Sequence, residues 1–138
     1  MKRLLLVPVL ALAACSTPLT SQRLEPSFAR TFSGLYALQQ TQDGRHGVQP
    51  DALGSAATCQ RSGTEASGPG EDWVCQVTYQ DGKRLLTQSF EVQVKSDGCW
   101  KAEAPPTSQP VLRADPVTGA THVNPLSEFD GCLDTSWR

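Results

Sequence analysis

Most of the motifs that would assign an activity are missing from this chain. It contains no Cys-x-x-Cys, Gly-x-Ser-x-Gly or His-Glu-x-x-His pattern, no phosphate-binding loop and no dinucleotide-binding glycines, and it has only two histidines. Lysine and arginine total 12 against 14 acidic residues, so a basic surface for nucleic acid is not expected. These absences predict a protein that is not an enzyme, needs no cofactor or metal ion and does not bind nucleic acid.

The chain also lacks an apolar run long enough to cross a bilayer. The longest run, Leu4 to Ala14, is broken by Pro8 and falls well short of the roughly 20 residues that a transmembrane helix needs. Lys2 and Arg3 precede it and small residues end it, which is typical of an export signal. We therefore expect residues 1–14 to be a signal peptide that is removed.

The signal ends in Leu12-Ala13-Ala14-Cys15, which resembles the lipobox of bacterial lipoproteins. In that family the cysteine thiol carries a diacylglyceryl group and becomes the first residue of the mature chain. The resemblance implies that Cys15 is the lipid attachment site and that the partner is a membrane, the cell membrane or the outer membrane, with the protein facing the periplasm or the exterior. Two acyl chains suffice for stable anchoring. An ordinary signal peptide cut near Ala14 is the alternative.

Four further cysteines predict disulfides, because an exported domain enters a compartment where they form. Cys59, Cys75, Cys99 and Cys132 allow three pairings. We favour Cys59 with Cys75 and Cys99 with Cys132, because neighbours in sequence pair most easily and the strand pattern agrees. The alternative, a metal or redox site, lacks both a Cys-x-x-Cys motif and a histidine close in sequence to a cysteine.

Composition divides the mature chain into a lipidated tether, residues 15–23, and a single domain, residues 24–138. Apolar residues recur at helical spacing after the tether and predict a helix from Pro26 to Gln40, with Gly44 as its stop. The residues that form this stripe are Leu24, Phe28, Phe32, Leu35 and Tyr36. We expect the stripe to cover a sheet; a partner-binding face is the alternative. Residues 41–72, rich in glycine and serine, predict a loop with one short strand at 56–59.

Two alternating runs joined by Asp81-Gly82 predict a β-hairpin. With Gln80 opposite Lys83, one face of the hairpin is apolar and the other polar. The residues expected on the apolar face are Trp73, Cys75, Val77, Leu86, Phe90, Val92 and Val94. The next turn, at 96–98, is predicted to have three residues with Gly98 left-handed, because only that register places Trp100 on the same face.

Pro105-Pro106 then ends the last strand, and residues 105–138 are predicted to be an irregular, proline-rich tail. A turn is expected at 115–119 and another at Asp130-Gly131-Cys132, with the second disulfide clipping the tail to the sheet. Phe129 and Trp137 are expected to seal the tail onto the sheet rather than to form a binding surface.

The predicted fold class is therefore α+β, with one N-terminal helix packed on a small antiparallel β-meander, stapled by disulfides. The order of the helix, the Trp-x-Cys strand and the Asp-Gly-Cys-Trp turn resembles small secreted or lipid-anchored actinobacterial domains of unassigned function. A helix over an antiparallel sheet is also similar to cystatins, but their Gln-x-Val-x-Gly pattern is replaced by residues 93–97, Gln-Val-Lys-Ser-Asp.

Three functions remain open at this point. The first is a lipid-anchored cell-envelope module that binds a protein or envelope component. The second is a small-molecule-binding lipoprotein whose cavity lies between helix and sheet; its expected lining is Phe32, Tyr36, Trp73 and Phe90. The third is a minor hydrolase that uses His46 or His122. The adjacent carboxylates Glu71 and Asp72 are expected to be solvated rather than an acid/base pair.

Overall fold

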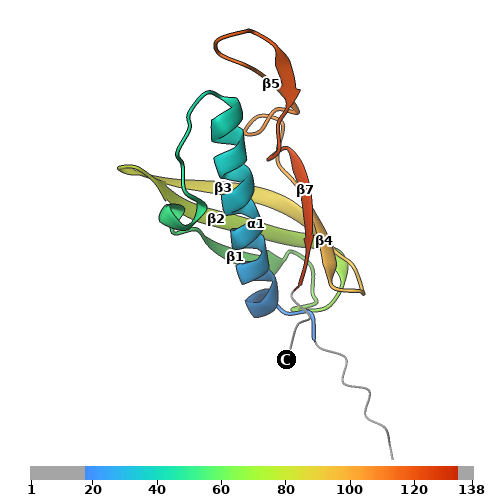
Figure 1. The fold of residues 1–138 in the computed structure, drawn as a ribbon. Helices are drawn as coiled ribbons and strands as arrows, with labels where there is room; N and C mark the ends of the chain where they lie inside the picture. The colour runs from blue at the N-terminus through green and yellow to red at the C-terminus, as the bar shows by residue number, and fades with distance from the viewer. Residues whose placement is uncertain (1–17, 134–138) are drawn as a thin grey trace, which may run out of the picture.

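One helix packs on a five-stranded antiparallel sheet, and a two-stranded sheet lies beyond one end of that layer (Figure 1). This computed structural model describes residues 18–133, so Cys15 and Trp137 lie outside the described residues. The elements are α1 (Ser21–Gln42), the 3-10 turn η1 (Pro50–Leu53), β1 (Ala56–Arg61), β2 (Gly70–Asp81), β3 (Arg84–Val94), β4 (Cys99–Glu103), β5 (Leu112–Ala114), β6 (Thr121–Val123) and β7 (Glu128–Cys132). The larger sheet has the order β1-β2-β3-β4-β7, which confirms the predicted fold class.

Helix α1 is longer than predicted at its N-terminal end. It begins at Ser21, so the tether does not extend to residue 23 and Pro26 lies inside the helix rather than in its first turn. The early start follows from packing, because Leu24 is already buried in the core while Pro26 is exposed. The backbone carbonyl of Leu19 accepts a hydrogen bond from the amide of Gly68, so the chain is held to the domain even before the helix starts.

The β2–β3 hairpin forms as predicted, but the predicted register is wrong by two residues. Asp81 pairs with Arg84, so the turn is Gly82-Lys83 and Gln80 does not face Lys83. Gly82 has φ +62° and Lys83 has no positive φ, which is the pattern of a type II′ turn. A shift of two residues leaves every side chain on its original face, so the predicted apolar face is still the buried one.

The turn between β3 and β4 agrees with its prediction. The Gly98 amide donates to the carbonyl of Lys95 and the Lys95 amide to the carbonyl of Cys99, which leaves a three-residue loop. Gly98 has φ +87°, a conformation that other residues rarely adopt. Val94 then pairs with Trp100, and Trp100 is 1% exposed on the face covered by α1.

The core is an aromatic cluster between α1 and the sheet. Phe28 is the centre, with its ring 5.2 Å from Trp100 and 5.5 Å from both Phe90 and Phe129. Burying Phe129 in this way confirms that it seals the C-terminal segment onto the sheet. The four residues expected to line a cavity are instead packed within this core. Phe32, Tyr36, Trp73 and Phe90 are all at most 5% exposed.

Both disulfides have the predicted partners and join directly opposed residues on neighbouring strands. Cys59 and Cys75 pair between β1 and β2, and Cys99 and Cys132 pair between β4 and β7. The second bridge closes a sequence separation of 33 residues, so it ties the C-terminal segment to the middle of the chain.

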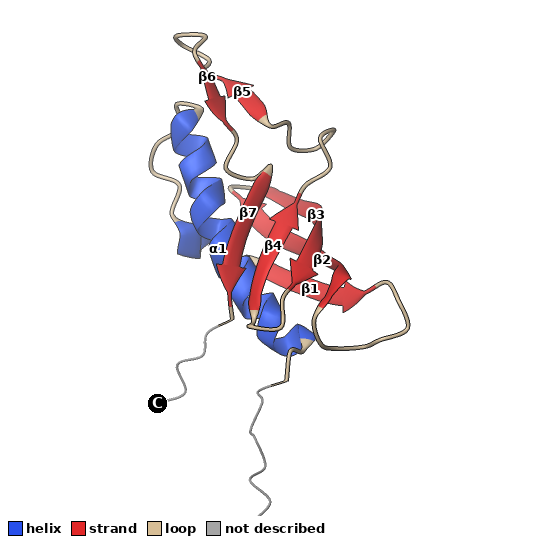
Figure 2. Cartoon of the chain, turned by 90° about the vertical axis from the view of Figure 1, so that its right-hand side faces the viewer, coloured by secondary structure: helices blue, strands red, loops and turns tan. Residues whose placement is uncertain are grey.

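The C-terminal segment is more ordered than predicted. Asp130-Gly131-Cys132 is not a turn, because it lies within β7, which pairs with β4 at the edge of the main sheet (Figure 2). The expected turn at 115–119 is present and joins β5 to β6, where the Asp115 carboxylate accepts hydrogen bonds from the amides of Val117 and Thr118. In the segment predicted as the loop 41–72, the short strand expected at 56–59 is present as β1, and the unpredicted elements are η1 and the first residues of β2.

Candidate functional site

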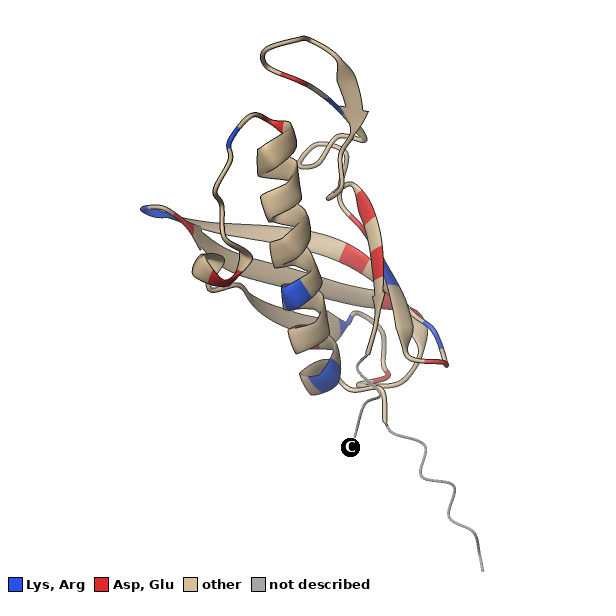
Figure 3. Ribbon diagram, in the orientation of Figure 1, with Lys and Arg blue, Asp and Glu red and all other residues tan. Residues whose placement is uncertain are grey.

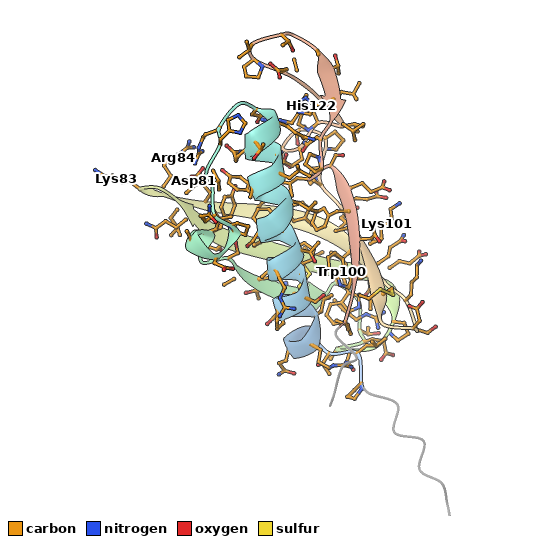
Figure 4. The ribbon with its side chains drawn as sticks, in the orientation of Figure 1. Asp81, Lys83, Arg84, Trp100, Lys101 and His122 are labelled. Carbon is orange, nitrogen blue, oxygen red and sulfur yellow. A yellow bond between two sulfur atoms is a disulfide. The ribbon has the colours of Figure 1, made fainter. Side chains whose placement is uncertain are left out.

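The two histidines are not arranged as a hydrolytic site in residues 18–133. His46 is exposed in the loop after α1, and His122 lies on β6. No hydrogen bond joins either imidazole to a hydroxyl or a carboxylate among the described residues; the nearest approach is 3.9 Å between His122 Nε2 and Asp43 Oδ1. Figure 4 shows His122 at the end of the molecule where β5 and β6 lie.

His122 instead belongs to a junction that places the β5–β6 hairpin on the end of α1. Arg113 pairs with His122 across the hairpin, and its guanidinium donates two hydrogen bonds to the Asp43 carboxylate at the helix C-cap. Directly opposed residues share a face, so Arg113 and His122 point to the helix while Leu112 and Val123 point away from it.

A buried amide network fixes the same segment from the inside. Asn124 is fully buried, and its side chain accepts from Gln39 Nε2 (2.7 Å) and the Leu126 amide (3.0 Å) and donates to Gln109 Oε1 (2.9 Å). Gln109 in turn donates to Gln88 on β3 at 2.8 Å. Because these groups satisfy one another, they hold the C-terminal segment in one position and are not free to bind a ligand.

An ion pair with a third hydrogen-bonding partner lies at the base of the β2–β3 turn. The Arg45 guanidinium donates two hydrogen bonds to the Asp81 carboxylate, and the Tyr36 hydroxyl donates a third at 2.6 Å. These bonds, led by those from Arg45, lower the pKa of Asp81 to about 2. Burial, and then the bond to Asp81, raise the pKa of Tyr36. Because the carboxylate stays ionised and the phenol keeps its proton, these groups are suited to stabilising the fold rather than to transferring a proton.

Asp72 is paired rather than solvated. Its carboxylate accepts from Arg61 Nη2 at 2.6 Å and from the Gly63 amide at 2.9 Å, and the bonds from Arg61 are the main cause of its lowered pKa. Neighbouring Glu71 is exposed, so the two carboxylates do not form an acid/base pair.

The exposed apolar side chains gather on one segment. Among residues 18–133, six large apolar residues are exposed, and four of them lie between residues 111 and 123: Val111, Leu112, Val117 and Val123. Val111 and Val123, 60% and 64% exposed, line a groove of about 680 Å³ together with Ala104, Pro105 and Pro106. A groove of this size falls within the usual range of ligand sites.

Three glutamates also line this groove. Glu91, Glu103 and Glu128 line it and lie side by side on β3, β4 and β7, because Glu91 pairs with Glu103 and Glu103 pairs with Glu128. Like charges directly opposite one another destabilise a sheet, so this carboxylate row works against the fold. A local rule broken in this way is characteristic of functional surfaces.

A single cation balances part of the row. Lys101 Nζ lies 3.0 Å from Glu128 and 3.1 Å from Glu103, and these bonds, that to Glu128 first, raise the pKa of Lys101. Glu91 forms no salt bridge within the described part of the chain. Figure 3 shows acidic positions, in red, on β3, β4 and β7. The groove therefore combines an apolar wall with an excess of negative charge.

No metal site and no membrane span are found among residues 18–133: they hold no group of three or more Cys, His, Asp and Glu side chains suited to a metal ion, and no helix long and apolar enough to cross a bilayer. The groove itself was missed by sequence reasoning. One signal was available in the sequence: residues 128–131 alternate between charged residues and apolar residues or glycine, which is typical of a strand. With Cys132 opposite Cys99, such a strand would have placed Glu128 beside Glu103.

No protein-family model, no curated protein and no solved structure matches this chain.

Proposed function

We propose that this protein is a lipid-anchored, non-catalytic binding module of the cell envelope. The single observation that carries the proposal is the groove, where the exposed side chains of Val111 and Val123 meet the row of three glutamates. Contiguous apolar surface rimmed by charge is typical of protein interaction sites. The lipobox at Cys15 supplies the anchor.

The position of the groove suits an anchored protein. The start of the described chain and the end of β7 lie at one end of α1, and β5 and β6 lie at the other (Figures 1 and 2). Helix α1 has 22 residues and is therefore about 33 Å long. A lipid on Cys15, only three residues before Pro18, would hold the first end at the membrane and present the groove side to the envelope space.

The anchor has a direct test. Intact mass of the protein extracted from membranes should show a chain that starts at Cys15 and carries acyl chains, and Cys15→Ala should move the protein to the soluble fraction. A Cys15→Ala variant that stays in the membrane fraction would contradict the anchor.

Binding by the groove is tested by the size of the complex released from membranes in mild detergent. We expect the wild-type protein to migrate well above the size of a single chain, and Val111→Ser with Val123→Ser to reduce it to the single-chain size. Val117→Ser is the matched control, since Val117 is 88% exposed but does not line the groove. Wild type and groove variant of equal, single-chain size would refute binding at this surface.

A further inference from the structure

The tip of the β2–β3 hairpin has the chemistry that the groove lacks. Lys83 and Arg84 are exposed at the turn, and Leu85 beside them is 72% exposed. No salt bridge joins either cation to another side chain among the described residues. Figure 4 shows Lys83 at the outer end of the hairpin, well away from the helix. The tip thus carries two exposed positive charges, of which Arg84 lies opposite Asp81 across the hairpin, next to an exposed apolar side chain.

The groove presents the complementary surface. Its carboxylate row holds three negative charges against one lysine, and Val111, Val123 and the two prolines line the same groove. Opposite potentials of this kind select partners and fix how they meet. Leu85 would lie against the apolar wall while the two cations of the tip face the glutamates.

We propose that the groove binds the β2–β3 tip, residues 82–85, of a second copy of this chain. The tip and the carboxylate row lie on opposite sides of the molecule (Figure 3). A contact between two different surfaces is heterologous, so copies associate head to tail in a row or a ring.

Anchoring favours this contact, and the inference rests on the proposed function in that respect. Lipid anchors confine all copies to one plane and raise their effective concentration, so a small interface suffices. In Figure 1 the tip and the strands that carry the carboxylate row lie at similar positions along the length of α1. Copies that stand side by side on one membrane therefore bring tip and groove to the same height.

Charge reversal on two differently tagged copies tests the contact. Both copies keep Cys15, are expressed in the same cells and are purified in mild detergent through one tag. Wild-type copies should co-purify. Lys83→Glu with Arg84→Glu in both copies should reduce the yield about tenfold or more, since it places like charges together. Glu103→Lys with Glu128→Lys in both copies should do the same.

Mixing the two reversed variants gives the decisive comparison. A reversed tip faces a reversed groove in that mixture, so co-purification should return towards the wild-type yield. Lys95→Glu reverses an exposed cation away from the tip and should leave the yield unchanged. Circular dichroism checks that each variant is folded; if the groove reversal unfolds the protein, the tip reversal alone decides.

Three results would overturn the inference: wild-type copies that do not co-purify, a yield that charge reversal leaves unchanged, or reversed variants that do not rescue each other. These results are separable from failure of the proposed function. If the complex lost in the Val111→Ser and Val123→Ser variant contains a different protein and no second copy, the groove is still a binding site and only the identity of the partner assigned here is wrong.

Discussion

Gly131 on β7 offers the sharpest test of how the sheet is held together. It pairs with Trp100 on β4, and the indole ring lies directly over it. A Cβ atom at Gly131 would lie 2.6 Å from Cζ2 and 2.9 Å from Cε2 of that ring, distances that real Cβ atoms do not show. Gly131→Ala therefore requires Trp100 to move.

Trp100 has little freedom to move. It is 1% exposed, its ring lies 5.2 Å from that of Phe28, and its Nε1 donates a hydrogen bond to Ser27 Oγ at 3.1 Å. Overpacking a tight core costs about 1–3 kcal/mol, and losing the hydrogen bond adds about 1 kcal/mol. We expect Gly131→Ala to lower the free energy of unfolding by about 2–4 kcal/mol.

Gly34→Ala is the matched control, because it adds the same methyl group where the structure has room. Gly34 lies inside α1, and nothing lies within 4 Å of a Cβ built there. Alanine is favoured over glycine in a helix by roughly 1 kcal/mol, so this variant should be more stable than the wild type. Urea unfolding of the oxidised protein measures both changes. Equal stability of the two variants would refute the assigned contact between Gly131 and Trp100.

Three further predictions concern the contacts that fix the ends of the sheet. The lowered pKa of Asp81 means that its bond to Arg45 stabilises the fold fully above about pH 4 and is lost as the pH falls through about 2. Asp81→Asn should cost about 1 kcal/mol at pH 7, because Arg45 is half exposed and solvent screens the pair. In thermal melts the difference from wild type should shrink as the pH approaches 2 and vanish below it. Replacing Cys99 and Cys132 together by alanine should cost roughly 3.7 kcal/mol in urea unfolding, given the 33-residue separation, and a loss below about 1 kcal/mol would contradict the loop-closure argument. Asn124→Ala should cost about 3 kcal/mol, because it leaves several buried amide groups unpaired, and a variant as stable as wild type would show that the network is not essential.

The sequence was sufficient for the elements whose patterns are local. The 3.6-residue stripe predicted α1, and the alternation around two Asp-Gly turns predicted β2, β3 and β4 with their buried face. It could not fix the β2–β3 register, because a shift of two residues preserves both faces and the pattern is the same in either case. The choice depends on the turn and on the long-range contacts of Asp81 with Tyr36 and Arg45.

The groove was beyond the reach of the sequence for a different reason. Glu91, Glu103 and Glu128 become one row only when β7 pairs with β4. The sequence did not predict β7, because its Asp-Gly-Cys residues are more typical of a turn. The apolar wall depends on the β5–β6 hairpin, whose position is set by the Arg113 contact with Asp43 rather than by any apolar pattern. Long-range polar contacts of this kind leave little trace in hydrophobic periodicity.

The central claim is that the groove is the binding surface of the anchored protein, and photo-crosslinking in living cells tests it most directly. A photo-reactive residue is placed at Val123, inside the groove, or at Val117, which lies outside it and is more exposed, in the chain that retains Cys15. The account predicts one defined crosslinked product from Val123 and none from Val117. No product from Val123, or the same products from both positions, would contradict it.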